Sequence, residues 1–327
     1  MLEHGGRLHE AARQYSTPLS QWLDLSTGIN PQGWPVPDIP PRCWQRLPES
    51  GDGLLQAARR YYGAPSLLAV AGSQQAIQAL PRLRPTSRVG MIFPAYAEHA
   101  LAWRQEGHGV VPLRPGQIDA MLSQLDVLVL VHPNNPTGQR YDPAELLGWH
   151  QQLAARGGWL VIDEAFMDCC PEQSLAAQSG RQGLIVLRSL GKFFGLAGAR
   201  VGFVLAEQAL LQRLEGLLGP WTVSHPSRWV AARALEDTDW HQQARLQLRC
   251  NGERLRALLD SCAFEPAGGC ELFQWVLAPD AAAIHHALAG KGILVRRFDN
   301  PASLRFGLPG DEVGWSRLAS ALRGLPQ

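Results

Sequence analysis

The stretch SLGKFFGLAGAR, residues 189–200, decides how this sequence is interpreted. It follows an apolar, β-branched run at 184–187 and precedes another at 201–205, so it is predicted to be a loop between two buried strands. Desolvation in such a loop favours the neutral amine of Lys192, the form that attacks a carbonyl group to make a Schiff base. Ser189 and Arg200 flank this lysine with a hydroxyl and a permanent cation, both suited to binding a phosphate. Taken alone, the stretch is equally consistent with a surface loop that carries a solvated lysine.

Three further motifs stand in order around this loop. N-N-P-T-G occupies residues 134–138, D-E-A-F occupies 163–166, and G-x-R-x-G spans 198–202. Together with S-L-G-K, the ordered set resembles the fold-type I pyridoxal-phosphate (PLP) enzymes of the aminotransferase class I/II group. The resemblance implies an α/β fold with a large domain built on a mostly parallel sheet, a smaller C-terminal α+β domain, PLP as cofactor, and a homodimer.

The pattern of apolar runs supports the same fold from the residues themselves. Strands are predicted at 89–93, 110–113, 127–132, 159–162, 184–188 and 201–205, with helices between several of them. This alternation is typical of a mostly parallel sheet that is covered on both faces. Ligands of such sheets bind at the carboxyl ends of the strands. Asn135, Asp163 and Lys192 each end or follow a strand, so they are predicted to lie on one rim.

We predict three regions along the chain. Residues 1–35 form an N-terminal arm, residues 36–222 form the large PLP-binding domain, and residues 223–327 form the small domain. A proline-bounded segment at 220–226 is predicted to be the hinge. Within the small domain, the pattern predicts the order strand, helix, strand, strand, helix between residues 272 and 322.

The resemblance also assigns cofactor contacts. Asp163 matches the carboxylate that keeps the pyridine nitrogen protonated, Asn135 matches the residue that binds the ring hydroxyl, and Tyr96 matches the aromatic residue that stacks on the ring. Tyr96 could instead be an ordinary core tyrosine. A glycine turn at 72–74 feeds a helix N-terminus, which suits a phosphate but is also an ordinary strand-to-helix turn. The catalytic set is Lys192, Asp163 and Tyr96, and the cofactor-binding set is Gly72, Ser73, Gln74, Tyr96, Asn135, Asp163, Ser189, Lys192 and Arg200.

The sequence departs from the family pattern at two positions. Phe166 stands where relatives often have a tyrosine that also bonds the ring hydroxyl, so Asn135 is expected to act without it. Leu47 stands where many relatives have a tyrosine that reaches the cofactor phosphate of the neighbouring subunit, so that bond is expected to be lost. The bond between Asn135 and Pro136 resembles one that is cis in the family.

The N-terminal arm carries H-G-G at 4–6, L-D-L-S at 23–26, where a short strand is expected, and I-N-P-Q-G at 29–33. These segments resemble the opening of one subgroup, the threonine-phosphate decarboxylases of cobalamin biosynthesis. In that subgroup the arm folds over the substrate, a small phosphorylated amino acid. Arg305 matches the arginine that binds the substrate carboxylate, and Arg296 matches a second arginine assigned to the substrate phosphate; a solvated strand-end arginine is the alternative for Arg296. The predicted substrate-binding set is His4, Gly5, Gly6, Asn30, Asn135, Arg296 and Arg305.

Three functions are compatible with these motifs. The arm favours PLP-dependent decarboxylation of L-threonine O-3-phosphate to (R)-1-aminopropan-2-yl phosphate. A histidinol-phosphate-like or aromatic aminotransferase shares every PLP motif and remains the alternative. A PLP-binding regulator would carry a DNA-binding module before the aminotransferase domain, for which the short arm has no room.

Composition limits the partners and the compartment. The 327 residues carry a net charge of +1, so no global field attracts the chain to nucleic acid or to a membrane surface. The sequence has no long apolar run that could span a membrane, and its N-terminus lacks a signal pattern. Its six cysteines form no C-x-x-C pair, which favours reduced thiols in a cytoplasmic protein and no metal site.

Overall fold

The computed structural model describes residues 4–325, which form two compact units. The larger unit comprises residues 34–135 and 140–242. The smaller unit comprises the residues up to 33, the short segment 136–139 and the residues from 243 onward. Helix α10 (Thr238–Ser261) begins in the larger unit and continues in the smaller one.

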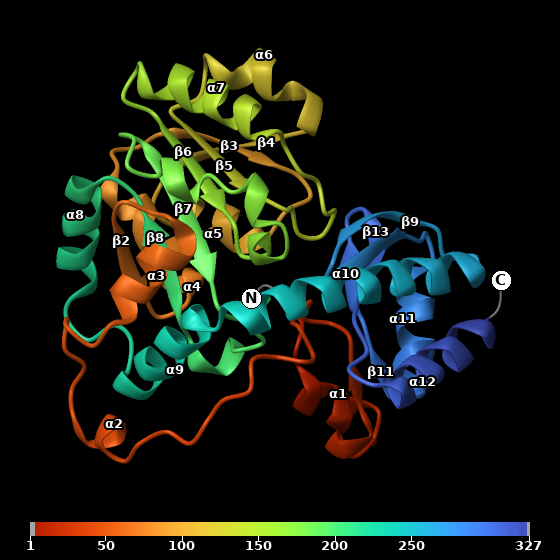
Figure 1. Cartoon of the computed structure of the whole chain (residues 1–327). Helices are drawn as coiled ribbons and strands as arrows, with labels where there is room; N and C mark the ends of the chain where they lie inside the picture. The colour runs from red at the N-terminus through yellow and green to blue at the C-terminus, as the bar shows by residue number, and fades with distance from the viewer. Residues whose placement is uncertain (1–3, 326–327) are drawn as a thin grey trace. The chain divides into compact units, whose positions relative to one another are not determined.

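A seven-stranded sheet forms the centre of the larger unit, in the order β2-β8-β7-β6-β5-β3-β4 within residues 34–242 (Figure 1). The strands from β7 to β4 run parallel to one another, whereas β8 is antiparallel to both of its neighbours. This arrangement confirms the mostly parallel sheet. The strands are β2 (Leu67–Val70), β3 (Arg88–Ile92), β4 (Gly109–Leu113), β5 (Val127–Val131), β6 (Trp159–Asp163), β7 (Leu184–Ser189) and β8 (Gly202–Leu205).

Helices cover this sheet and bury its apolar side chains. Odd-numbered residues of β5, β6 and β7 pack with α4, α5 and α8 in one hydrophobic core, because alternate side chains of a strand point to the same face. Helix α7 packs against β6; it begins with Pro143 at its first position, and the Asp142 side chain accepts the N–H of Ala144 at 2.7 Å. The helices of this unit are α2 (Arg42–Gln45), α3 (Leu54–Tyr62), α4 (Ser73–Ala79), α5 (Ala97–Gln105), α6 (Ile118–Leu122), α7 (Pro143–Ala154), α8 (Gln208–Leu218) and α9 (His225–Glu236).

The smaller unit contains an antiparallel sheet in the order β12-β13-β10-β9, and a two-residue strand β1 that pairs in parallel with β11. Because β1 comes from the N-terminal arm, the arm is part of this unit (Figure 1). The strands are β1 (Leu23–Asp24), β9 (Pro266–Cys270), β10 (Phe273–Leu277), β11 (Ile293–Leu294), β12 (Arg296–Asp299) and β13 (Ala302–Gly307). The helices are α1 (Leu8–Gln14), α11 (Ala281–Gly290) and α12 (Glu312–Arg323).

The structure adds a strand that the sequence pattern did not predict. Strand β9 contains Gly268 and Gly269, which weaken any prediction of a strand from propensity. A Cβ atom on Gly268 would lie 2.1 Å from the carbonyl oxygen of Thr137, and one on Gly138 would lie 2.0 Å from that of Gly269. The glycines of β9 and of the N-N-P-T-G motif therefore allow two backbone segments to touch.

One expectation about the backbone is wrong. Within residues 4–325 the cis peptide bonds precede Pro94, Pro133 and Pro301, so the bond before Pro136 is trans. Over the same residues, no helix is both long and apolar enough to cross a membrane.

Candidate active site

A pocket of about 140 Å³ lies in the larger unit at the carboxyl ends of β5, β6 and β7. Asn135, Asp163 and Lys192 all line it, so the structure brings together the residues that the sequence predicts on one rim. Every residue of the predicted cofactor-binding set except Gly72 lines this pocket, namely Ser73, Gln74, Tyr96, Asn135, Asp163, Ser189, Lys192 and Arg200.

The carboxylate of Asp163 is held through both of its oxygens. Oδ1 accepts the backbone N–H of Ala165 at 3.1 Å, and Oδ2 lies 2.9 Å from Nε2 of His99. His99 and Asp163 are both buried. Because a carboxylate can only accept, Nε2 of His99 carries a hydrogen and donates it to Asp163. Asp163 is therefore fixed in one orientation at the edge of the pocket.

The G-x-R-x-G motif places a cation beside the glycine turn. Gly72 has a φ of 72°, and a Cβ atom there would lie 2.4 Å from Nη2 of Arg200. Gly202 belongs to β8, and a Cβ atom on it would lie 2.6 Å from the backbone nitrogen of Ser73. The positive φ of Gly72 and the backbone contact of Gly202 are the features that require glycine here. The guanidinium of Arg200 and the hydroxyl of Ser189 line the same pocket, which suits a bound phosphate.

Tyr96 is the residue immediately before α5, and its hydroxyl is oriented by two neighbours. The Tyr96 hydroxyl donates to Oε1 of Gln74 at 3.1 Å, and Nε2 of Gln74 donates to Oε2 of Glu98 at 2.9 Å. Burial, together with the negative charges of Asp163 and Glu98, raises the pKa of Tyr96 to about 12. The phenol therefore stays protonated at neutral pH and keeps its role as a donor.

The amine of Lys192 lies over the ring of Phe166. Its Nζ lies 5.5 Å from the centre of the buried ring of Phe166, the residue that replaces the tyrosine common in relatives. A phenyl ring offers the amine no hydroxyl group, and its face attracts a cation weakly. The substitution therefore leaves an apolar surface beside the lysine.

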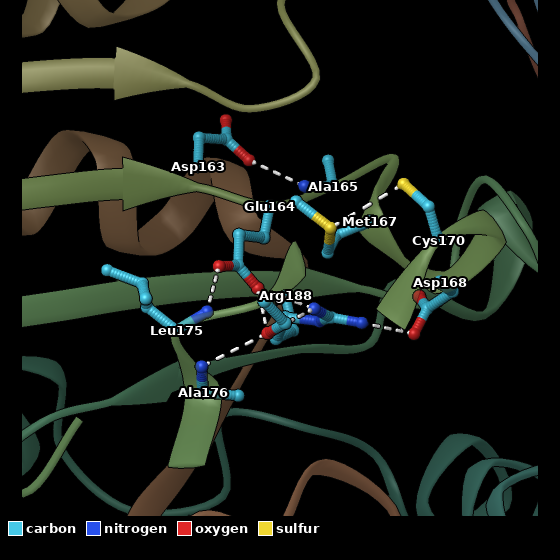
Figure 2. A network of polar contacts seen from close by, with 10 residues as sticks. Asp163, Glu164, Ala165, Met167, Asp168, Cys170, Leu175, Ala176 and Arg188 are labelled. Atoms are coloured by element: carbon cyan, nitrogen blue, oxygen red, sulfur yellow. Dashed lines mark hydrogen bonds and ion pairs between the residues drawn. The ribbon is translucent and has the colours of Figure 1, made fainter. Parts of the chain in front are cut away.

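A buried ion network lies next to this site, on the opposite face of β6 and β7 from Asp163 (Figure 2). Nη1 of Arg188 lies 2.6 Å from Oε2 of Glu164, and Nη2 donates to Asp168. Glu164 also accepts the hydroxyl of Ser174 at 2.5 Å and the N–H of Leu175 at 2.8 Å. Burial raises the pKa of Glu164, and the two carboxylates raise that of Arg188 against the opposing effect of burial. The network fastens the irregular segment after β6 to β7.

A second pocket, of about 390 Å³, lies within the smaller unit. His4, Gly5 and Arg296 of the predicted substrate-binding set line it, together with Arg7 and Arg297. Most of the charge that these side chains can carry is positive, although Glu10 also lines the pocket. The pocket therefore suits an anionic ligand.

Arg296 and Arg305 are directly opposite each other on β12 and β13. Burial, followed by the charge of Arg296, lowers the pKa of Arg305 to about 10, so Arg305 remains charged at neutral pH. Like charges directly opposite on neighbouring strands are destabilising. A bound anion would relieve this repulsion, which indicates a binding role for the pair.

The other predicted substrate residues lie outside the lining of this pocket. Gly6 donates its N–H to Oγ of Ser26 at 2.7 Å. Asn30 is buried, and its Oδ1 accepts the N–H of Gln32 at 2.9 Å, which closes the turn of the N-P-Q-G segment. Arg305 is almost fully buried and donates from Nη2 to the carbonyl oxygen of Ser26 at 2.6 Å.

Sequence reasoning missed His99, Arg188 and Ser26. A usable signal for His99 was its place in the first turn of the helix that follows β3, because such a helix begins at the carboxyl edge of the parallel sheet, where the rim lies. The partners of Arg188 and Ser26 become visible only once the pairing of the strands is known.

Comparison with known proteins agrees with this arrangement. The aminotransferase class I and II family matches residues 49–322, and the chain belongs to that family. Over its whole length the chain is 58% identical to the threonine-phosphate decarboxylase of Pseudomonas aeruginosa, of which it covers 99%. It is 42% identical to the threonine-phosphate decarboxylase of a Sinorhizobium species, over 98% of this chain and 97% of that protein.

A solved structure confirms the fold. The histidinol-phosphate aminotransferase of Sinorhizobium meliloti, in complex with pyridoxal-5'-phosphate, superposes with a TM-score of 0.84 over 98% of this chain and 94% of that one. Its sequence is 19% identical, so the likeness is one of fold alone.

Proposed function

We propose that this chain catalyses the PLP-dependent decarboxylation of L-threonine O-3-phosphate to (R)-1-aminopropan-2-yl phosphate, a carbon–carbon lyase reaction of cobalamin biosynthesis. The observation that carries the proposal is the pair Arg296 and Arg305, two cations directly opposite each other in the smaller unit. The substrate has two anionic groups, a carboxylate and a phosphate, and guanidinium groups bind both well. The identity of 58% to a threonine-phosphate decarboxylase over the whole chain supports the same substrate.

The residues of the larger unit's pocket fit PLP. A carboxylate, a lysine amine, an aromatic ring and a guanidinium line one pocket, and they match a cofactor with a basic ring nitrogen, a carbonyl, a flat ring and a phosphate. Asp163 would hold the proton on the ring nitrogen, Asn135 would bind the ring hydroxyl, and Tyr96 would stack on the ring. Gly72, Ser73, Gln74, Ser189 and Arg200 would hold the phosphate. PLP, when bound, supplies an electron sink for the electron pair of the broken bond.

The protein's own residues determine which bond of the substrate breaks and supply the proton that replaces the lost carboxylate. Lys192 would hold the cofactor through its amine and, once the substrate has displaced it, would carry the proton that is returned to Cα of the substrate. Arg305 binds the substrate carboxylate as a fork and turns it toward the orientation in which it leaves as CO2. Arg296 and His4 bind the phosphate. The arm residues Gly5, Gly6 and Asn30 cover the substrate.

A histidinol-phosphate-like or aromatic aminotransferase is the second candidate. It would use the same pocket residues, because in both reactions the amine of the substrate would first take the place of Lys192 on the cofactor. The arm and the whole-chain identity to a decarboxylase favour the first candidate.

One assay separates the two candidates. Protein loaded with PLP is incubated with O-phosphothreonine and no oxo-acid, and CO2 and the amine are measured. We expect both products in equal amounts, with little pyridoxamine phosphate, and much less reaction with unphosphorylated L-threonine. Transfer of amino groups from glutamate to an imidazole or aromatic oxo-compound without CO2 release would establish the aminotransferase instead.

We also propose that the protein acts as a homodimer in the cytoplasm. The larger unit exposes Trp44, Leu47, Phe93 and Trp221 by half or more of their surface. The dimer that the family resemblance implies would bury such side chains against a second copy of the chain. Trp221→Asp and Trp44→Asp together should give a monomer by light scattering, whereas Val313→Asp, on α12 of the smaller unit, should not.

A further inference from the structure

Ser26 lies in the N-terminal arm and connects residues 5 and 6 of that arm with the arginine proposed to bind the substrate carboxylate. It lies just after β1 and is 1% exposed. Its hydroxyl accepts from Gly6, its hydroxyl and backbone N–H both donate to Asp24, and its carbonyl accepts from Arg305. We propose that Ser26 is a positioning residue that fixes residues 4–6 of the arm relative to Arg305, and so sets where the substrate binds; this inference rests on the proposed function.

The arm is held at Ser26 by contacts that only glycines permit. The N–H of Gly6 donates to Oγ of Ser26 at 2.7 Å, and Gly6 has a φ of 78°. A Cβ atom on Gly5 would lie 2.3 Å from the carbonyl oxygen of Ser26. Two adjacent glycines thus let the arm touch Ser26 directly, immediately beside His4.

The hydroxyl of Ser26 is oriented by a carboxylate. It donates to Oδ1 of Asp24 at 2.6 Å, and the N–H of Ser26 donates to the same oxygen at 2.9 Å. Because the hydroxyl hydrogen is used by Asp24, an oxygen lone pair is left to accept from Gly6. Asp24 therefore sets the direction in which Ser26 holds the arm.

The carbonyl of Ser26 fixes Arg305. Nη2 of Arg305 donates to it at 2.6 Å, and the guanidinium lies over the ring of Phe273, 5.1 Å from its centre. A buried guanidinium without such partners would be costly, so these contacts determine where the charge lies. Ser26 and Arg296 line the same pocket, so one residue contacts the arm, Arg305 and the space that suits an anion.

A serine-to-alanine comparison within the smaller unit tests the proposal. Ser26→Ala keeps the carbonyl and the backbone N–H that donates to Asp24, but removes the two bonds of the hydroxyl, one from Gly6 and one to Asp24. Ser303→Ala is the matched control. Ser303 is buried on the same strand as Arg305, and its hydroxyl donates to the carbonyl of Pro301 at 2.8 Å, away from the arm. We expect KM for O-phosphothreonine to rise about tenfold in Ser26→Ala, the effect of one or two lost hydrogen bonds, with the PLP dissociation constant unchanged. Ser303→Ala should leave KM within about twofold of the wild type.

Two further variants separate positioning from general damage. Asp24→Asn keeps an acceptor oxygen, so its KM for O-phosphothreonine should stay close to that of the wild type. Asp24→Ala loses that oxygen, so its KM should rise as in Ser26→Ala. Amide hydrogen exchange of the arm should be faster in Ser26→Ala than in Ser303→Ala, both without ligand and with inorganic phosphate as the probe. Equal exchange and equal KM in the two serine variants would overturn the proposal, as would a loss of PLP affinity that matches the loss of substrate affinity.

Failure of the proposed function would look different. In that case the wild-type protein itself would release no CO2 from O-phosphothreonine. The exchange comparison on cofactor-free protein would still show whether Ser26 holds the arm.

Discussion

Replacing Arg188 with methionine should cost far more stability than replacing an exposed arginine. Arg188 is 1% exposed, and its partners Glu164 and Asp168 are fully buried. Figure 2 shows the contacts of Arg188 with these two carboxylates. Its guanidinium also lies over the ring of Tyr62, 4.6 Å from the centre. Methionine fills similar space but leaves two buried carboxylates without their cation. Breaking a buried ion pair in this way costs about 3–5 kcal/mol, a large part of the roughly 5–15 kcal/mol that stabilises a typical protein.

The loss should depend on pH in a direction that follows from the buried carboxylates. Burial already raises the pKa of Glu164, and removal of Arg188 raises it further. The folded variant then binds a proton that the unfolded chain has released. Its stability relative to the wild type should therefore fall as the pH rises above the unfolded pKa and through the folded one.

Urea unfolding of the cofactor-free proteins, followed by tryptophan fluorescence at about pH 5 and about pH 8, measures this effect. Arg254→Met is the matched control, because Arg254 makes a two-bond ion pair with Glu312 in which both side chains are largely exposed. Such a pair is worth about 1 kcal/mol or less. Arg188→Met should be the less stable variant, and more so at the higher pH. Equal losses in the two variants, or a loss in Arg188→Met that does not change with pH, would refute the reasoning.

Three substitutions test the assignments at the two pockets. Lys192→Ala should abolish CO2 release and the near-visible absorbance that PLP gains when a lysine holds it, with circular dichroism unchanged; retained turnover would refute the role of this lysine. Asp163→Asn should still bind PLP but lose most turnover, because an amide cannot stabilise a protonated ring nitrogen as a carboxylate does; a normal rate would make Asp163 purely structural. Arg296→Ala should weaken binding of O-phosphothreonine by about 1.5–3 kcal/mol, the scale of a charge-assisted hydrogen bond, without changing PLP occupancy. An equal loss of PLP would contradict phosphate recognition by Arg296.

The sheet and the rim of the pocket could be predicted because they depend on local patterns. Apolar runs of strand length define the buried strands, and the residues after them must lie at the carboxyl edge of a parallel sheet. Asn135, Asp163 and Lys192 were placed together on this basis, and the structure has them in one pocket.

Contacts between residues distant in sequence could not be predicted in the same way. Gly268 and Gly269 argue against a strand by propensity, yet β9 forms because glycine lets residues 137–138 approach its backbone. Ser26 meets Arg305 only because β1 pairs with β11, and the short strand expected at 23–26 does not by itself show which strand it pairs with.

The pleat of β6 and β7 explains why one of two neighbouring side chains lies in the pocket and the other in the buried ion network. Asp163 and Glu164 are adjacent acids, but alternate side chains of a strand point to opposite faces, so Asp163 meets His99 while Glu164 meets Arg188. The same alternation turns Ser189 to the pocket and leaves Arg188 behind it. A shift of either strand by one residue would therefore exchange the buried ion network for the pocket. Because Arg188 binds the segment that follows β6, it opposes this shift, and the ion network and the pocket depend on a single strand register.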